Sequence, residues 1–194
     1  PLRLFQALVN ASARQGEVDA SSSLDWLERQ PPPTLIATPP AAIQPSYGTT
    51  FYVPNNDGDL WFDKDNKIAK RTEKNVRPTR LREDTVVHYL WPLTEPAPVG
   101  LSAFMRMASS ISAFGWGIDM AVADAAFLTQ EEADALEGER WHPSDAGDSV
   151  SLRVPTEGTL ADLHARHDAF LNRISLEKDA VFKPVPPLSK FAIT

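Results

Sequence analysis

Eight lysines and arginines crowd into residues 64–82, a density that suits the binding of phosphate groups. The cations are Lys64, Lys67, Lys70, Arg71, Lys74, Arg77, Arg80 and Arg82. With only Asp65 and Glu73 among them, this basic block carries a net charge of +6, while the whole chain carries −7 and the remainder −13. Counterion release on binding a polyanion grows with the cations gathered in one place, so the basic block predicts contact with a nucleic-acid backbone. A solvated charged linker is the alternative interpretation.

Aromatic residues and a glycine turn would add contacts to such a site. The aromatic residues that flank the basic block are Tyr52, Trp61, Tyr89 and Trp91. Single-stranded RNA is often held by stacking of bases on aromatic side chains beside basic ones, so Tyr52 and Tyr89 are candidates. The same residues also suit cross-strand packing. Gly115 and Gly117 form a turn where an RNA phosphate can approach the backbone closely, because glycine has no Cβ.

The sequence predicts no catalytic centre, no cofactor and no metal site. His164 and His167 stand three residues apart on an expected helix, but no third ligand follows at a suitable spacing, and His167 falls on the apolar stripe. His88 lies inside an expected strand, where a structural role fits better than a general base. Phosphate-cradling, nucleophile-elbow and zinc-protease motifs are missing from the chain.

The composition is that of one globular domain. The chain has 194 residues, 42% of them apolar, which is enough to bury a core. Its 17 prolines cluster in runs that read as extended connections. The absence of cysteine fits a reducing compartment and excludes a disulfide framework. No apolar stretch approaches the length that spans a bilayer, so we expect no membrane partner.

Hydrophobic periodicity predicts a mixed α+β fold, with a sheet covered on one face by helices. Helices are expected at residues 2–14, 24–29, 101–114 and 159–173, and strands at 34–37, 49–53, 85–91, 118–128, 149–154 and 191–194. Ser23 is the expected cap of the second helix, and Thr129 with Glu132 has the spacing of a capping box. Strands 49–53 and 85–91 bracket the basic block. The simplest geometry is therefore a long antiparallel excursion with the basic block on its projecting loop.

Several segments of the chain resemble one family. Residues 2–9 (LRLFQALV), 24–27 (LDWL), 52–57 (YVPNND), 87–92 (VHYLWP) and 158–167 (GTLADLHARH) carry the resemblance. Together they are similar to the five-like, N-terminal half of the fused five/six subunit of type I-U, also named type I-G, CRISPR–Cas systems. That subunit belongs to the repeat-associated superfamily.

The resemblance implies a single five-like, ferredoxin-like (RRM-type) domain over residues 1–194, with a thumb insertion at 49–92. It implies a subunit of the Cascade surveillance complex in the prokaryotic cytoplasm, which caps the 5′ handle of the crRNA in antiviral defence. Its partners would be the Cascade backbone and large subunits and, through the complex, target DNA. Family members begin with a strand and a glycine-bearing segment that these residues lack, so we expect a missing first strand. The six-like half, which cleaves the repeat hairpin, is also expected to lie outside this chain.

Three functions therefore compete at this stage. The leading hypothesis is a non-catalytic cap on the crRNA handle, with the basic block, Tyr52, Tyr89, Gly115 and Gly117 as RNA contacts. The alternative is a metal-independent endoribonuclease that processes precursor crRNA, with His88 and Tyr89 as acid and base. A protein-interaction scaffold without RNA contact is the third. The negative remainder of the chain suits contacts with basic neighbours.

Overall fold

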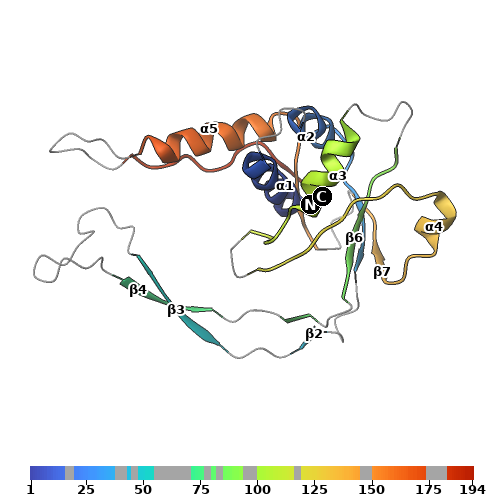
Figure 1. Ribbon diagram of the computed structural model, residues 1–194, viewed down its shortest axis with the longest axis horizontal. Coiled ribbons are helices and arrows are strands. Elements are labelled where there is room, and N and C mark those ends of the chain that lie inside the picture. Colours follow the sequence, from blue (N-terminus) through green and yellow to red (C-terminus); the bar gives the residue numbers. More distant parts are fainter. Residues whose placement is uncertain are drawn as a thin grey trace, which may run out of the picture.

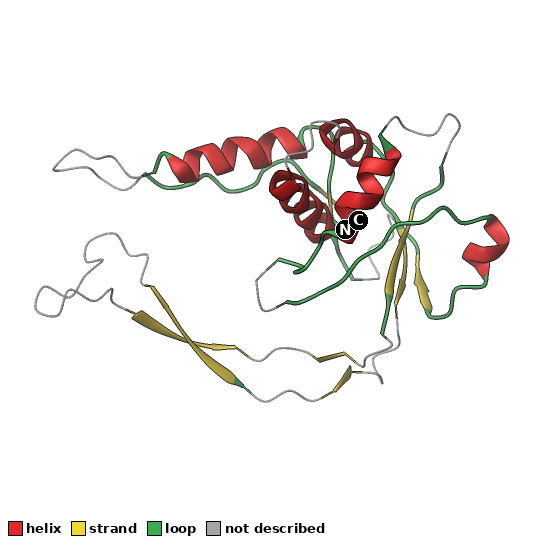
Figure 2. Ribbon diagram, in the orientation of Figure 1, coloured by secondary structure: helices red, strands yellow, loops and turns green. Residues whose placement is uncertain are grey.

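A computed structural model describes residues 1–15, 20–37, 43–44, 48–54, 71–76, 80–81, 85–93, 100–115, 119–144, 150–173 and 183–194. Its helices are α1 (Leu2–Gln15), α2 (Ala20–Glu28), α3 (Leu101–Ser109), α4 (Gln130–Asp134) and α5 (Thr159–Leu171). Its strands are β1 (Thr34–Ala37), β2 (Ile43–Gln44), β3 (Thr49–Pro54), β4 (Arg71–Val76), β5 (Arg80–Leu81), β6 (Val87–Leu90), β7 (Glu139–Trp141), β8 (Arg153–Val154) and β9 (Ala192–Ile193). This α+β fold with antiparallel sheets confirms the predicted class and is consistent with a ferredoxin-like fold (Figure 2).

A three-stranded antiparallel sheet lies at the centre of the fold, in the order β6-β1-β7. β1 pairs with β6 from Thr34 opposite Leu90 to Ala37 opposite Val87, and with β7 through Leu35 opposite Trp141. In Figure 1, helices α1, α2 and α3 gather on one side of this sheet, and α4 lies on the other. β7 was not predicted from the sequence, because its three exposed residues have no apolar alternation.

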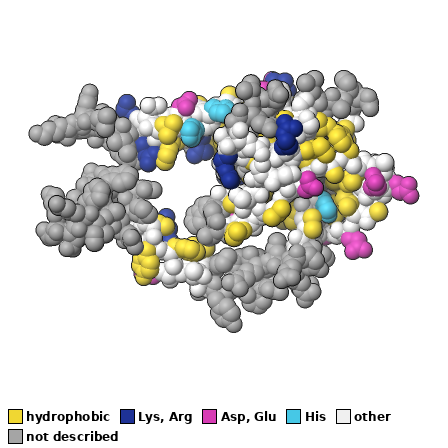
Figure 3. Space-filling model, viewed as in Figure 1, with side chains coloured by type: hydrophobic (Ala, Val, Ile, Leu, Met, Phe, Trp, Pro, Cys, Tyr) yellow, Lys and Arg dark blue, Asp and Glu magenta, His cyan; other side chains and the backbone are white. Residues whose placement is uncertain are grey.

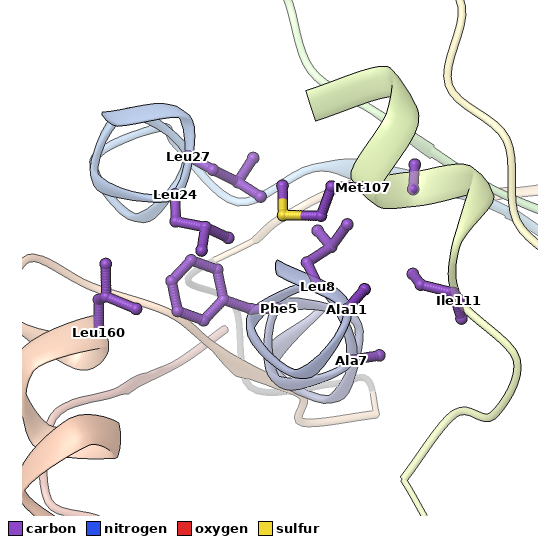
Figure 4. Close-up of a cluster of buried hydrophobic side chains, with 10 residues drawn as sticks. Phe5, Ala7, Leu8, Ala11, Leu24, Leu27, Met107, Ile111 and Leu160 are labelled. Carbon is purple, nitrogen blue, oxygen red and sulfur yellow. The ribbon is translucent and has the colours of Figure 1, made fainter. Parts of the chain in front are cut away.

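The core forms where α1, α2, α3 and the start of α5 meet (Figure 4). Phe5 and Leu8 of α1 are 1% exposed, and Met107 of α3 is fully buried. They contact the inner faces of α2 and α5 through residues such as Leu24 and Leu160. Truncating a buried phenylalanine to alanine typically costs about 3–5 kcal/mol, so Phe5 is a main determinant of stability.

A two-stranded ribbon projects from the three-stranded sheet. β2 pairs with β5 near its base, and β3 pairs with β4 further out, both antiparallel. Figure 1 shows the ribbon running away from β6 on the same side as α5. The structure thus has a projecting antiparallel excursion, but its strand pairing differs from the predicted one. β6 pairs with β1, and the described parts of the basic block are the strands β4 and β5 rather than a loop.

Several predicted elements have other bounds. Ser23 is not a cap: α2 begins at Ala20, and the Ser23 hydroxyl donates to the Gly100 carbonyl at 3.0 Å. α3 ends at Ser109 rather than at the predicted residue 114. At this end the hydroxyls of Ser109 and Ser110 donate to the backbone carbonyl groups four residues earlier. β8 contains two residues instead of six, although position 149 lies outside the described residues.

The predicted strand at 118–128 is wrong over its described part, residues 119–128. A single bridge joins Ala113 to Met120 there, and the following residues are extended without a ladder. Met120 and Val122 are 84% and 94% exposed, whereas Ala123 and Ala125 pack against the core. The extended segment therefore packs against the core on one side without pairing to a partner strand after Met120.

The segment around α4 confirms the capping-box prediction. The Thr129 hydroxyl accepts from the Glu132 backbone N–H at 3.2 Å, and Glu132 accepts in return from the Thr129 N–H at 2.7 Å. At the other end, Arg140 of β7 donates to the carbonyl groups of Ala133, Asp134 and Leu136. Charge-assisted bonds thus satisfy both ends of this short helix.

Candidate nucleic-acid interface

The ribbon's outer pair is formed by β3 and β4, and β4 contains Arg71 and Lys74 of the basic block. β3 consists largely of β-branched and aromatic residues, which favour strands, whereas β4 has the sequence RTEKNV and a weak strand propensity. β4 therefore forms a strand because it pairs with β3, and its own composition does not favour one. The pairing runs from Thr49 opposite Val76 to Pro54 opposite Arg71. β4 carries three charged residues, Arg71, Glu73 and Lys74, and its residues 72–75 are exposed.

Three of the predicted cations fall on described strand positions. Arg71 begins β4 opposite Pro54, Arg80 begins β5 opposite Gln44, and Lys74 lies exposed opposite Phe51. The remaining predicted cations lie outside the described residues, namely Lys64, Lys67, Lys70, Arg77 and Arg82. The chain from Pro54 to Arg71, which contains the first three of these, connects the ends of the paired strands.

Tyr52 is 65% exposed on β3 and faces Glu73 across the ribbon. On the same face the Thr50 hydroxyl donates to Asn75 Oδ1 at 2.6 Å, and the Asn75 amide donates to Glu73 Oε1 at 3.4 Å. Lys74 and Phe51 share the opposite face, because opposed residues of an antiparallel pair point the same way. Tyr52 and Lys74 therefore lie on different faces of the ribbon.

Tyr89 lies in an aromatic cluster at the sheet rather than on the ribbon. Its ring stacks on Trp91 with centroids 6.3 Å apart and meets Phe114 at 6.4 Å. Trp91 and Phe114 in turn pack against the core. Burial raises the pKa of the Tyr89 phenol above its ordinary value, with a smaller opposing effect from Arg3. The phenol therefore stays protonated at neutral pH and can donate a hydrogen bond.

Gly115 follows Phe114 and lies beside Arg3, which the sequence had not singled out. Gly115 has φ +117, and a Cβ built on it would stand 3.5 Å from Arg3 Cδ. The Arg3 guanidinium is exposed and lies 3.8 Å from the Asp119 carboxylate. Tyr89, Gly115 and Arg3 thus lie near one another, while Gly117 lies outside the described residues. The sole sequence signal for Arg3 is that it is a cation on the first predicted helix.

His88 and Tyr89 are separated by the strand itself. His88 faces the same way as its partner Ile36, and Tyr89 the same way as its partner Leu35, on opposite faces of the sheet. Two groups on opposite faces of one sheet cannot act together on a single phosphodiester. The geometry thus gives no support to their acting as an acid and base pair.

Helix α5 forms a second projecting arm, and its predicted apolar stripe is buried only at the start. Leu160 is 5% exposed, but His167 is exposed, and Phe170 and Leu171 are 47% and 62% exposed. Figure 3 shows Lys, Arg and His side chains gathered over this helix. The Arg173 guanidinium lies 3.4 Å from the centroid of the Phe170 ring.

Two carboxylates fix α5 in place. Glu28 of α2 is 4% exposed and accepts hydrogen bonds from the backbone N–H groups of Gly158 at 2.9 Å and Leu160 at 2.7 Å. Asp162 accepts from the N–H groups of Ser189 at 2.7 Å and Lys190 at 2.9 Å. These two bonds, the Ser189 one first, hold the pKa of Asp162 below its ordinary value. The C-terminal segment is thereby tied along the helix.

Within the residues that the structure describes, no three His, Cys, Asp or Glu side chains gather as metal ligands. His164 and His167 are both exposed on α5. Over the same residues, no helix has the length and apolar character that a membrane crossing requires.

Comparison with known proteins gives one family. A family model described as "CRISPR-associated protein, GSU0054 family" matches residues 1–193, nearly the whole chain. No curated protein and no solved structure matches the chain significantly.

Proposed function

This chain belongs to the GSU0054 family of CRISPR-associated proteins, and we propose that it is a non-catalytic, crRNA-binding subunit of a type I Cascade complex. In this proposal it is the five-like half of the type I-U (I-G) five/six fusion, an RRM-type domain of the repeat-associated superfamily. It caps the 5′ handle of the crRNA, beside the backbone and large subunits. Target DNA is reached only through the assembled complex.

The observation that carries the proposal is that Arg71, Lys74 and Arg80 of the basic block stand on strands of a projecting ribbon. Eight cations lie within 19 residues that fall between β3 and β6 in the sequence, in a chain that is otherwise acidic. A narrow two-stranded ribbon reaches away from the core, so it can lie along an RNA backbone without requiring a pocket. The thumb that we assign to residues 49–92 contains these cations.

The cluster of Tyr89, Gly115 and Arg3 supplies a second contact in this proposal. The protonated Tyr89 phenol and the exposed Arg3 guanidinium are donors suited to phosphate or ribose oxygens. Gly115, whose φ is +117, has no Cβ, so a phosphate can approach its backbone closely. In this proposal the ribbon is the main contact for the 5′ handle, and the cluster is an additional one.

The test compares two charge-reversal variants of the complete protein in its complex. The first carries Arg77→Glu, Arg80→Glu and Arg82→Glu. The matched control carries Arg14→Glu, Arg29→Glu and Lys190→Glu, which gives the same change in net charge away from the ribbon. RNA affinity is measured across a salt series. Each phosphate contact on a single strand contributes about 0.7 to the slope of log K against log salt, so the first variant loses about 2 units of slope.

The control variant is expected to keep the wild-type slope. A wild-type protein with a flat salt response, or equal losses in both variants, contradicts the proposal. Precursor RNA that is cleaved by these residues without metal would contradict the non-catalytic assignment.

A further inference from the structure

The β3–β4 ribbon has two chemically different faces, and the sequence does not tell them apart. One face carries the opposed pairs Thr50–Asn75, Tyr52–Glu73 and Pro54–Arg71, and the other carries the pairs Thr49–Val76, Phe51–Lys74 and Val53–Thr72. We refer to them as the Tyr52 face and the Phe51 face. Neighbouring residues on each strand alternate between these faces, so Phe51 and Tyr52 offer their rings to opposite sides.

A carboxylate occupies the Tyr52 face. Glu73 stands directly opposite Tyr52, and the side-chain amide of Asn75 donates to it at 3.4 Å. Asn75 is held in turn by the Thr50 hydroxyl. A base stacked on Tyr52 would bring its flanking phosphates toward this carboxylate, and like charges repel. Arg71, opposite Pro54, stands on this face one pair further along, so the charge directly opposite Tyr52 is negative and the cation is only a diagonal neighbour.

The Phe51 face combines an aromatic ring with a cation. Phe51 is 37% exposed and lies directly opposite the exposed Lys74. Opposed Cβ atoms in an antiparallel pair are about 5 Å apart, so the lysine stem runs beside the ring. Proteins that bind single-stranded nucleic acids stack the bases on aromatic rings and hold the phosphates with cationic side chains. The half-buried Val53 and Val76 border the ring with apolar surface.

We infer that the ribbon binds single-stranded RNA through its Phe51 face, with a base stacked on Phe51 and the adjacent phosphate held by Lys74. Tyr52, one of the two aromatic residues that the sequence predicted as RNA contacts, lies on the face that RNA does not contact. This inference rests on the proposed function and specifies the residues within that same site.

The decisive comparison is Phe51→Ala against Tyr52→Ala, two aromatic truncations at adjacent positions of one strand. The affinity of the complete protein for a labelled single-stranded oligoadenylate is measured for each. Loss of one base–aromatic stack weakens binding about 5- to 150-fold, and we expect a loss in this range for Phe51→Ala. For Tyr52→Ala we expect the wild-type affinity within about twofold.

Two further variants separate stacking from support of the ribbon. Phe51→Trp retains an aromatic face and should keep the affinity, whereas Phe51→Leu keeps apolar bulk without it and should lose affinity as Phe51→Ala does. A charge pair tests the cation. Lys74→Gln should lower the salt slope by about 0.7, and Glu73→Gln, one residue away on the other face, should leave it unchanged.

The inference is overturned if Tyr52→Ala weakens binding more than Phe51→Ala, or if Phe51→Leu binds like the wild type. It is also overturned if Phe51→Ala keeps the RNA affinity but releases a protein subunit from the complex, since the face would then bind protein. If the Arg77, Arg80 and Arg82 reversal still removes RNA while Phe51→Ala does not, the proposed function stands and the Phe51 assignment fails. A wild-type protein that binds no RNA contradicts both.

Discussion

Glu28 connects α2 to α5, and its substitution gives a sharp test of the structure. The side chain is 4% exposed, and its two carboxylate oxygens accept from the N–H groups of Gly158 and Leu160. The first N–H groups of a helix have no partner within the helix, and a negative charge there also interacts favourably with the helix dipole. Glu28 therefore caps a helix that lies 130 residues away in the sequence.

The cost of changing Glu28 follows from these two bonds. A hydrogen bond to a charged group contributes about 1.5–3 kcal/mol. Glu28→Gln keeps one acceptor oxygen, replaces the other with a donor that opposes an N–H group, and so should cost about 1.5–3 kcal/mol. Glu28→Ala loses both bonds and should cost about 3–6 kcal/mol. For a chain of this size the glutamine variant corresponds to a fall in Tm of about 3–12 °C.

Urea unfolding followed by circular dichroism measures these costs. The matched control is Glu157→Gln, which alters the glutamate just before Gly158. The Glu157 side chain is 79% exposed, and its Oε1 lies 3.6 Å from Arg29 Nε. Exposed ion pairs contribute between 0 and about 1 kcal/mol, so the control should unfold nearly as the wild type does. If Glu28→Gln is no more destabilising than Glu157→Gln, the buried cap is refuted.

Gly138→Ala should destabilise the fold by about 2–6 kcal/mol, because its Cβ would meet Ile36 at 2.8 Å and φ is +139. Gly158→Ala, with φ +90 but no contact closer than 4.0 Å, should cost only about 1–3 kcal/mol, and equal losses in urea unfolding would contradict this. The lowered pKa of Asp162 stabilises the fold above the ordinary value of 3.8, and this contribution is lost as pH falls through the folded pKa. Asp162→Asn should therefore weaken the dependence of the unfolding free energy on pH in the acid range. An unchanged dependence would contradict the bonds from Ser189 and Lys190 to Asp162. The raised pKa of Tyr89 predicts a tyrosine that ionises above pH 10 in an ultraviolet titration, and that stability falls as pH rises above 10.

Local patterns predicted the elements whose residues determine their own structure. The helix at 2–14 and the strand at 34–37 were found because their apolar spacing matches the period of the element. Thr129 and Glu132 were identified as a capping box because that motif needs only four consecutive residues. The strand predicted at residues 191–194 is also confirmed, as β9.

Features that depend on long-range pairing could not be predicted. β4 is a strand because β3 pairs with it, and its charged sequence gives no such signal. The same pairing decides that Lys74 shares a face with Phe51 rather than with Tyr52. No local pattern singles out Glu28, since its partners lie 130 and 132 residues away in the sequence. The basic block was found correctly as a charge cluster, but its register is a property of the folded ribbon.

The most direct test of the account is crosslinking of the natural guide RNA in the purified complex, with the attached peptides identified by mass spectrometry. The account predicts a uniform crRNA whose 5′ handle crosslinks to the ribbon, within residues 49–82. An RNA-free protein, or crosslinks confined to α5 and the rest of the body, would contradict it.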